Sequence, residues 1–413
     1  MKALEYHISP WRWTICKAAS LLRPSACYGA LSPLRLVDRP VPPIPGPGWV
    51  RLRTLLGGIC GTDLGLIMLR QHPATILQRF ASFPAILGHE NVAVIDAVGD
   101  SAGDWSVGQR VCVDPAIGCA ASDDGSLCRL CAMGIASQCE RAGNGQLPPR
   151  ALLGLNRTTG GSWAEYFVAH TSQLHAVPDA VPDEQAVLLD PIASAAHAVL
   201  RRTPKPGEQV LVCGSGIIAL GIVASLRALG CDNHVAIAVR HEFQAELARK
   251  LGVSDVLRMP RKMSPADRYD LVARRVGGTR LAARFGNQAL LGGFDLVYDT
   301  TGSGNGMTDA IKWTRTRGTL VLVGTSGIAL VDTTPLWFDE LEVIGANGRQ
   351  IETDADGPIH TYDLVLKWIA SGRIDLSVLP IRRFRLTEYR TALRQLHQRG
   401  QNPIVKAVFD HRP

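Results

Sequence analysis

The sequence predicts an α/β protein in which a β-rich part is followed by a parallel sheet covered by helices. Short apolar runs broken by Gly and Pro fill the first ~190 residues, and strand-like and helix-like runs alternate after that. A glycine-rich turn joins the first strand and the first helix of the alternating part. The length of 413 residues predicts two or three domains. With 46% apolar and 20% charged residues, the composition is that of a globular chain and excludes disorder or a fibrous repeat as the main state.

The β-rich part contains four runs of strand-like composition. They are Trp49–Leu56, Asn91–Val98, Gln109–Val113 and Ala164–Val168. The proline-rich stretch Pro40–Gly48 is a connector before the first of them. The apolar patch Ile15–Leu22 is expected to be an inserted element that covers a core; a surface helix touching a partner or membrane is the alternative. Lys17 interrupts this patch, so we expect no signal peptide.

The alternating part predicts βαβ units, which form parallel sheets. Its expected strands are Gln209–Cys213, His234–Val239, Asp295–Asp299 and Thr319–Val323, and its expected helices are Ile217–Leu229, Glu242–Leu251 and Asn305–Arg315. Two more helices, Thr361–Ser371 and Thr387–Arg399, and a strand, Ile404–Phe409, are expected in the C-terminal part.

A dinucleotide site is predicted at the first strand–helix turn, Gly214-Ser215-Gly216-Ile217-Ile218. Amides at a helix N-terminus after such a turn receive a pyrophosphate. The second strand of a site for NAD ends near an acidic residue, which binds the ribose hydroxyls. Here Arg240 takes that place. This favours the 2′-phosphate of NADP, with NAD as the alternative if Arg240 is only solvated.

The ten cysteines are too few in a chain of this length for a disulfide framework. Four of them, Cys119, Cys128, Cys131 and Cys139, lie in one polar loop. Four thiolates form a closed tetrahedral zinc site, which stabilises a loop with little core of its own. Unrelated thiols, or a redox pair at Cys128 and Cys131, are the alternatives.

A second set of metal-binding residue types is dispersed. Cys60 lies in GGICGTDLG, and His89 and Glu90 lie in ILGHENVAV. A thiolate, an imidazole and a carboxylate can make an open zinc site whose free position takes water or substrate. Asp190, in LLDPIASAAH, is a further carboxylate whose membership the spacing does not decide.

In this order the motifs resemble those of the zinc-dependent medium-chain dehydrogenase/reductases, the alcohol, polyol and glucose dehydrogenase group. The resemblance covers nearly the whole chain and rests on GGICGTD, FPAILGHE, the four-cysteine loop, DPIASAAHAV and VLVCGSGIIALG. It implies a GroES-like catalytic domain at residues 1–195, a Rossmann NAD(P)-binding domain at 196–344, and a segment at 345–413 that completes the catalytic domain.

The resemblance also implies residue roles. Cys60, His89 and Asp190 would hold a catalytic zinc, with Glu90 as an adjacent or exchanging ligand. Thr62 would pass on the alcohol proton, and Asp63 would orient the ligands. Further cofactor contacts are expected where strands end, at Thr300, Gly302, Val323 and Gly324.

The chain departs from the family's pattern at three positions. Eight residues separate Cys119 from Cys128 instead of two, so Cys119 is the least supported ligand of its set and Cys112 competes with it. Gly65 stands where some relatives have a histidine that relays protons. Asp190 stands where relatives often have Cys or Glu.

The expected function is the reversible oxidation of an alcohol to an aldehyde or ketone with two zinc ions per chain and NADP or NAD. A zinc-independent NADPH-dependent reductase of activated double bonds is the alternative on the same fold, and a non-catalytic zinc- or nucleotide-binding protein is the alternative of another class. The insert at 66–82 is expected to shape the substrate pocket. Phe80, Trp105 and Trp337 slightly favour an apolar substrate.

Partners and location follow from charge and hydropathy. The net charge of +7 is dispersed, and no basic run is interleaved with aromatic residues, so no nucleic acid is expected. No stretch approaches 18 uninterrupted apolar residues, so no membrane is expected. We expect a cytoplasmic homo-oligomer, a dimer or a tetramer as in relatives, that acts on a small alcohol or carbonyl compound.

Overall fold

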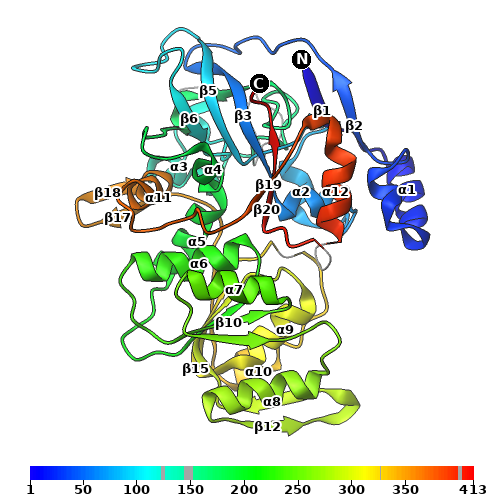
Figure 1. Ribbon diagram of the computed structural model, residues 1–413, viewed down its shortest axis with the longest axis vertical. Helices are drawn as coiled ribbons and strands as arrows, with labels where there is room; N and C mark the ends of the chain where they lie inside the picture. Colours follow the sequence, from blue (N-terminus) through cyan, green and yellow to red (C-terminus); the bar gives the residue numbers. More distant parts are fainter. Residues whose placement is uncertain (122–125, 144–151, 326, 399–401) are drawn as a thin grey trace. The chain divides into compact units, whose positions relative to one another are not determined.

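The computed structural model describes residues 1–121, 126–143, 152–325, 327–398 and 402–413 (Figure 1). The chain divides into two compact units. Unit 1 comprises Met1–Ala193 and Gly348–Pro413, and unit 2 comprises Ser194–Asn347. No helix in the described ranges is long and apolar enough to cross a membrane.

A seven-stranded sheet forms the centre of unit 1. Its order is β19-β20-β3-β5-β6-β8, and β7 pairs with β3 beside this path. The strands are β3 (Trp49–Ile59), β5 (Asn91–Val98), β6 (Arg110–Val113), β7 (Tyr166–His170), β8 (Leu174–Ala176), β19 (Ile381–Phe384) and β20 (Lys406–Asp410). The strands predicted in this part are therefore confirmed, although β3 extends three residues further than predicted and β7 starts two residues later.

A three-stranded sheet and several short helices complete unit 1. The sheet has the order β2-β1-β4, from β1 (Lys2–Tyr6), β2 (Leu34–Asp38) and β4 (Ala85–Ile86). The helical elements are α1 (Pro10–Leu22), η1 (Pro24–Tyr28), α2 (Gly61–Ile67), η2 (Ile76–Phe80), η3 (Cys119–Ala121), α3 (Arg129–Ala132), η4 (Ala136–Gln138), η5 (Thr171–Gln173), α4 (Asp183–Ala186), α11 (Thr361–Ala370), η7 (Leu386–Glu388) and α12 (Tyr389–His397). A hairpin of β17 (Ile351–Asp354) and β18 (Gly357–His360) leads into α11, and α5 (Leu189–Arg201) begins in unit 1 and continues into unit 2.

The predicted element Ile15–Leu22 is part of helix α1, which Ser9 caps by accepting from the amide of Arg12. Cys16 is buried in the core of unit 1, and Trp13 packs against that core. The expectation of a core cover is thus correct for one face of the helix. It is wrong for Ile15 and Leu22, which are exposed.

Unit 2 is built on a six-stranded parallel sheet with the order β11-β10-β9-β14-β15-β16. The strands are β9 (Val210–Cys213), β10 (Val235–Val239), β11 (Asp255–Arg258), β14 (Phe294–Asp299), β15 (Thr314–Leu322) and β16 (Glu342–Gly345). Counted along the chain, this is the order 3-2-1-4-5-6 of the Rossmann fold, which reverses between β9 and β14. The helices are α6 (Ile217–Ala228), α7 (Glu242–Lys250), α8 (Pro265–Val276), α9 (Gly304–Trp313) and α10 (Thr334–Phe338). The predicted fold class is confirmed.

Some elements of the structure differ from the expectation. The hairpin of β12 (Thr279–Ala282) and β13 (Gln288–Leu291), joined by a turn that contains η6 (Arg284–Gly286), was not predicted because most of its side chains are exposed and give no apolar run. β15 begins five residues before the predicted strand. The helix expected over Thr387–Arg399 is η7 followed by α12, and Arg399 lies outside the described residues.

Candidate active site

Three side chains from two segments of unit 1 meet at one place. The Sγ of Cys60, a ring nitrogen of His89 and a carboxylate oxygen of Glu90 lie within 4.8 Å of one another. Cys60 is the N-cap residue of α2, and its Sγ accepts from the amide of Thr62 at 3.5 Å. His89 and Glu90 lie in the short link between β4 and β5. The start of a helix and the start of a strand therefore fix this group.

Asp63 supports the group from behind. Its Oδ2 accepts from the amide of Cys60 at 2.9 Å, and its Oδ1 lies 3.4 Å from Nδ1 of His89. Both side chains are buried. Burial alone would lower the pKa of His89, but Asp63 and Cys60 raise it well above its usual value. A carboxylate behind a histidine fixes the tautomer and the direction of the imidazole in metal sites.

Glu90 is fully buried, and its Oε2 pairs with Nζ of Lys406 in β20. Burial raises the pKa of Glu90, and Lys406 and His89 counteract that rise. Lys406 was missed in the sequence, although a lone lysine in the apolar run Ile404–Phe409 is a usable signal. A charge within a buried strand needs a partner.

Asp190 lies outside this group of ligand atoms. Its Oδ1 accepts from the hydroxyl of Tyr362 at 2.9 Å and pairs with Nη1 of Arg349 at 3.0 Å. Nε of the same arginine lies 3.2 Å from Oδ1 of Asp114. Burial raises the pKa of Asp114, but Arg349 and His360 hold it well below its usual range. No local pattern along the chain marks Asp190 as a member of this buried ion-pair network.

The residues at this cluster fit a zinc ion. Within the described ranges, Oε1 of Glu90 is buried without a hydrogen-bond partner. Buried polar atoms are seldom left in that state without an ion or a water. One thiolate, one imidazole and one carboxylate match the ligand types of zinc, and three protein ligands leave a fourth position open.

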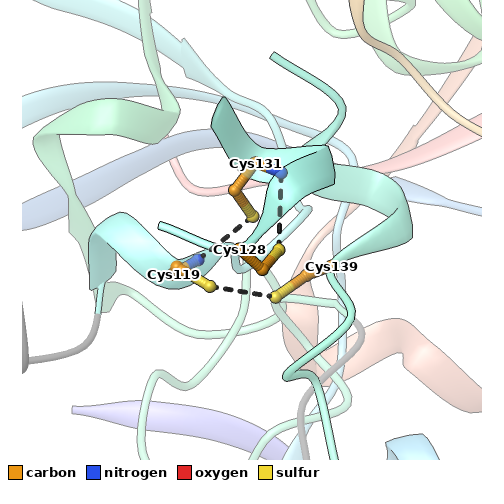
Figure 2. A group of neighbouring side chains, drawn as sticks. All are labelled: Cys119, Cys128, Cys131 and Cys139. Atoms are coloured by element: carbon orange, nitrogen blue, oxygen red, sulfur yellow. Dashed lines mark hydrogen bonds between the residues drawn. The ribbon is translucent and has the colours of Figure 1, made fainter. Parts of the chain in front are cut away.

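The four cysteines of the loop also converge (Figure 2). Their sulfur atoms lie within 4.8 Å of one another, and the Sγ atoms of Cys119 and Cys139 are 3.5 Å apart. The amide of Cys119 donates to Sγ of Cys131, and the amide of Cys131 donates to Sγ of Cys128, each at 3.4 Å. Burial raises the pKa of Cys128, but amide donors from Cys131 and Glu140 outweigh it and lower the value to about 6. Four clustered sulfurs held by amides fit a closed zinc site.

Cys112 does not join the four. It lies in β6, where its Sγ donates to the carbonyl oxygen of Ala186 at 3.4 Å. Phe80 packs against the four-cysteine cluster, and Trp105 packs against the core between strands of unit 1. Neither aromatic residue therefore supports the slight preference for an apolar substrate.

The side chains of a third set, His175, His360 and Asp363, already have partners within the protein. Nδ1 of His175 lies 2.8 Å from Oδ1 of Asp363. Nδ1 of His360 accepts from the amide of Tyr362, and its Nε2 faces Asp114 at 3.4 Å. These contacts explain the set as an anchor for the start of α11.

The predicted phosphate-binding turn follows β9 in unit 2. Gly214 has a φ of +115°, and a Cβ there would lie 2.2 Å from Oγ1 of Thr300. Gly216 is the N-cap residue of α6, and it offers no side chain to the first amides of that helix. The amides of Ile217 and Ile218 therefore point out of the helix end, where an anion is favoured.

The other predicted cofactor contacts lie beside this turn. Oγ1 of Thr300 donates to the carbonyl oxygen of Cys213 at 2.8 Å. The amides of Val323 and Gly324 both lie 2.9 Å from the carbonyl oxygen of Asp299. A Cβ on Gly324 would lie 2.4 Å from the amide nitrogen of Gly302. The carboxyl ends of β9, β14 and β15 thus meet where open α/β sheets bind ligands.

Arg240 is exposed at the end of β10. The first acidic residue after it, Glu242, pairs with Arg249 and Arg258 at 3.1 Å each. In the part of the chain that the structure describes, no carboxylate forms an ion pair with Arg240. Its charge is available to a phosphate.

Gly65 occupies the position of the histidine that relays protons in some relatives. A Cβ on Gly65 would lie 3.8 Å from Nε2 of Gln71. The predicted pocket insert thus places an amide side chain beside this gap. Gln71 was not singled out in the sequence, because nothing in its spacing marked it.

Comparisons with known proteins agree with these features. The family model described as "Alcohol dehydrogenase GroES-like domain" matches residues 46–179, and that described as "Zinc-binding dehydrogenase" matches residues 218–371. An L-threonine 3-dehydrogenase of Deinococcus deserti is 30% identical over 318 residues, which cover 76% of this chain and 81% of that enzyme. An L-idonate 5-dehydrogenase of Vitis vinifera is 27% identical, over 83% of this chain and 82% of that enzyme.

Among solved structures, a short chain alcohol dehydrogenase (rspB) from Escherichia coli CFT073 in complex with the cofactor NADH has the same fold. It superimposes with a TM-score of 0.72 at 22% sequence identity, and the match covers 99% of each chain.

Proposed function

Because the chain belongs to the zinc-dependent medium-chain dehydrogenase/reductase superfamily, we propose that it reversibly oxidises an alcohol to an aldehyde or ketone at a zinc held by Cys60, His89 and Glu90. The chain is an NAD(P)-dependent oxidoreductase of CH–OH groups, as its relatives are. The observation that carries the proposal is the convergence of a thiol, an imidazole and a carboxylate within 4.8 Å, with Asp63 behind the imidazole.

Each residue of the site has a proposed task. A bound zinc ion would supply Lewis acidity to the substrate oxygen, and a bound nicotinamide would supply the redox chemistry. Cys60, His89 and Glu90 provide the ligand atoms, and Asp63 orients His89. Lys406 balances the buried charge of Glu90. Thr62, whose amide contacts Sγ of Cys60, carries the substrate proton away through its hydroxyl.

Asp190 was predicted as a ligand, and that role requires its Oδ1 to leave Tyr362 and Arg349. We propose that Glu90, and not Asp190, is the third zinc ligand. Asp190 then affects the electrostatic potential of the site through its ion pair with Arg349. The four cysteines are proposed to hold a second, structural zinc, which gives two ions per chain.

The substrate proposed is a polar hydroxylated compound. The relatives are named for threonine, idonate, galactonate and sorbitol. A screen of such alcohols and their carbonyl products with NADH and NADPH, followed at the nicotinamide absorbance band, tests the proposal. Turnover of an activated double bond by protein with no zinc at the Cys60 cluster would support the zinc-independent alternative. Failure to bind either nicotinamide would support a non-catalytic protein.

Asp63→Asn is expected to lower zinc affinity or kcat/KM by about 10–100-fold, the usual cost of losing the carboxylate behind a metal-binding histidine. The amide oxygen of asparagine can still accept from Cys60 and so preserves the start of α2. Zinc per chain and kcat/KM are measured together. Asp96→Asn, which breaks an ion pair with Arg51 elsewhere in unit 1, is the matched control. Equal behaviour of both variants would contradict the role of Asp63.

Arg240→Ala is expected to raise KM for NADPH by about 10–100-fold and to leave KM for NADH nearly unchanged. A charge-assisted hydrogen bond to the 2′-phosphate is worth about 1.5–3 kcal/mol, and only NADPH carries that phosphate. Arg261→Ala, at another exposed arginine of unit 2, is the control. If the variant shifts both KM values equally, or neither, the preference for NADP is wrong.

A further inference from the structure

Helix α1 presents an apolar face to solvent. Trp11 is 80% exposed, Ile15 54% and Leu22 89%. With the exposed Ala18, these residues recur at spacings of four, three and four, which places them on one stripe of the helix. A stripe of this kind normally faces a core.

The opposite face of α1 is the one that packs on the protein. Cys16 is buried, and Trp13 packs against the same core of unit 1. Nζ of Lys17 donates to the carbonyl oxygen of Leu69 at 2.8 Å, which ties the helix to the segment after α2. The orientation of the helix is therefore fixed, and its apolar stripe is exposed. Figure 1 shows α1 at the margin of unit 1. Leu21, at 80% exposure, widens the stripe.

The surroundings of the stripe are positively charged. No Asp or Glu occurs between Tyr6 and Val37, whereas Arg12, Lys17, Arg23 and Arg35 lie in that interval. Among the described residues, none of these four side chains forms an ion pair with a carboxylate. Glu5, which lies opposite Arg35 in the β1–β2 ladder, is paired with Arg39. An apolar face with unpaired arginines beside it fits an anionic partner.

A groove of about 310 Å³ lies beside the stripe. Trp11, Ile15 and Leu31 form its apolar wall, and Arg12 and Arg35 stand at the same groove. This combination suits an amphiphile with a phosphate head and an acyl chain, because the two arginines can meet the phosphate while the wall meets the chain.

A second copy of this chain fits the surface less well. Self-complementary pairing through α1 would bring the arginines of both copies together, with no carboxylate in either segment to separate them. An anionic bilayer instead offers an apolar environment to the stripe and phosphate groups to the arginines.

We propose that α1 is a peripheral membrane-binding element that inserts Trp11, Ile15, Leu21 and Leu22 into the interface of an anionic phospholipid bilayer. Arg12, Arg23 and Arg35 then face the headgroup phosphates. With 13 residues, the helix is about 20 Å long and lies along the surface rather than across it. This differs from the expectation of no membrane partner, which rested on the lack of a spanning segment. It takes up the alternative that Ile15–Leu22 belongs to a surface helix that touches a partner or membrane.

The test is co-sedimentation of the full chain with vesicles of phosphatidylcholine alone and of equimolar phosphatidylcholine and phosphatidylglycerol. We expect binding to the anionic vesicles, little binding to the neutral ones, and weakening by added salt. The double variant Trp11→Ser/Leu22→Ser should lose at least about tenfold in partitioning, because two large apolar side chains no longer leave water. The control Phe285→Ser/Leu330→Ser, at two exposed apolar residues of unit 2, should bind as the parent does.

The outcomes separate membrane binding from misfolding of the variant and from contact between copies of the chain. Turnover of a water-soluble substrate and the thermal midpoint should match the parent in both double variants, which shows that they are folded. Absence of vesicle binding, equal binding to neutral vesicles, or unchanged binding of the α1 variant would overturn the proposal. Light scattering after size exclusion is run in parallel. If the parent protein does not bind vesicles and the α1 variant forms a smaller assembly than the parent, the proposal is overturned, and α1 is a contact between copies of the chain.

Discussion

Cys60→Ser is expected to lower kcat/KM by about 10³-fold or more. Loss of the thiolate removes one of the three ligand atoms that converge within 4.8 Å. A metal ion supplies several kcal/mol of charge stabilisation in the transition state, and every ~1.4 kcal/mol is tenfold in rate. Metal analysis should find one zinc per chain fewer than in the parent protein. The affinity for NADPH should stay measurable, because the predicted dinucleotide turn belongs to unit 2.

The control for this variant is Cys231→Ser. Cys231, like Cys60, is a partly buried free cysteine, and it belongs to unit 2. It should keep both zinc ions and full turnover. If Cys60→Ser retained full activity after losing a zinc ion, the proposed chemistry would be wrong. If it lost activity with its zinc content unchanged, Cys60 would act in some way other than as a ligand.

Arg349→Met is expected to destabilise the protein by about 3–5 kcal/mol. Arg349 is buried between two carboxylates, at 3.2 Å from Asp114 and 3.0 Å from Asp190. Removing the cation leaves both carboxylates in a low-dielectric interior without this counter-charge, which costs far more than losing a surface pair. Urea unfolding followed by a signal from unit 1 measures the loss, and Arg349→Lys should recover part of it.

Two readouts distinguish this effect from general damage. Arg317→Met, which breaks the exposed pair with Glu340, should change stability by less than about 1 kcal/mol. In the parent protein the pKa of Asp114 is held low. The ionised carboxylate therefore stabilises the folded state fully at any pH above the ordinary pKa of an aspartate, and this stabilisation is lost as the pH falls. Without Arg349, burial raises the pKa of Asp114 relative to the parent, so the folded variant takes up a proton there more readily than the folded parent does. The deficit should therefore be largest near neutral pH and shrink toward about pH 4. A deficit independent of pH would contradict the ion-pair role of Arg349.

Local patterns predicted part of unit 2, namely β9, α6, β10, α7, β14, α9 and β15, and missed β11, α8, α10 and β16. Val210–Cys213 is fully buried and strongly β-branched, and a glycine turn with a helix follows it. Such a run carries its own signal, because a parallel strand buried on both faces is apolar throughout. The β12–β13 hairpin carries no such signal, since most of its side chains are exposed.

The Cys60–His89–Glu90 cluster could be predicted only in part. Cys60 and His89 stand in motifs whose order along the chain resembles a family pattern. The partners that set their electrostatics, Lys406 for Glu90 and Arg349 for Asp190, are separated from them in sequence by more than a hundred residues. No local periodicity reports a contact of that kind. The exposed face of α1 could not be predicted for a related reason. An apolar patch in a sequence does not indicate which of its faces packs against the core.

The Glu90–Lys406 pair has a consequence for biosynthesis. Lys406 leaves the ribosome after the whole of unit 2, and β20, which carries it, must then enter unit 1 between β19 and β3. Unit 2 is continuous in sequence and can fold as it emerges, since domains fold as units during translation. A nascent chain that has folded unit 2 therefore still lacks the lysine that pairs with Glu90. The Glu90–Lys406 pair can therefore form only after the whole of unit 2 has been synthesised.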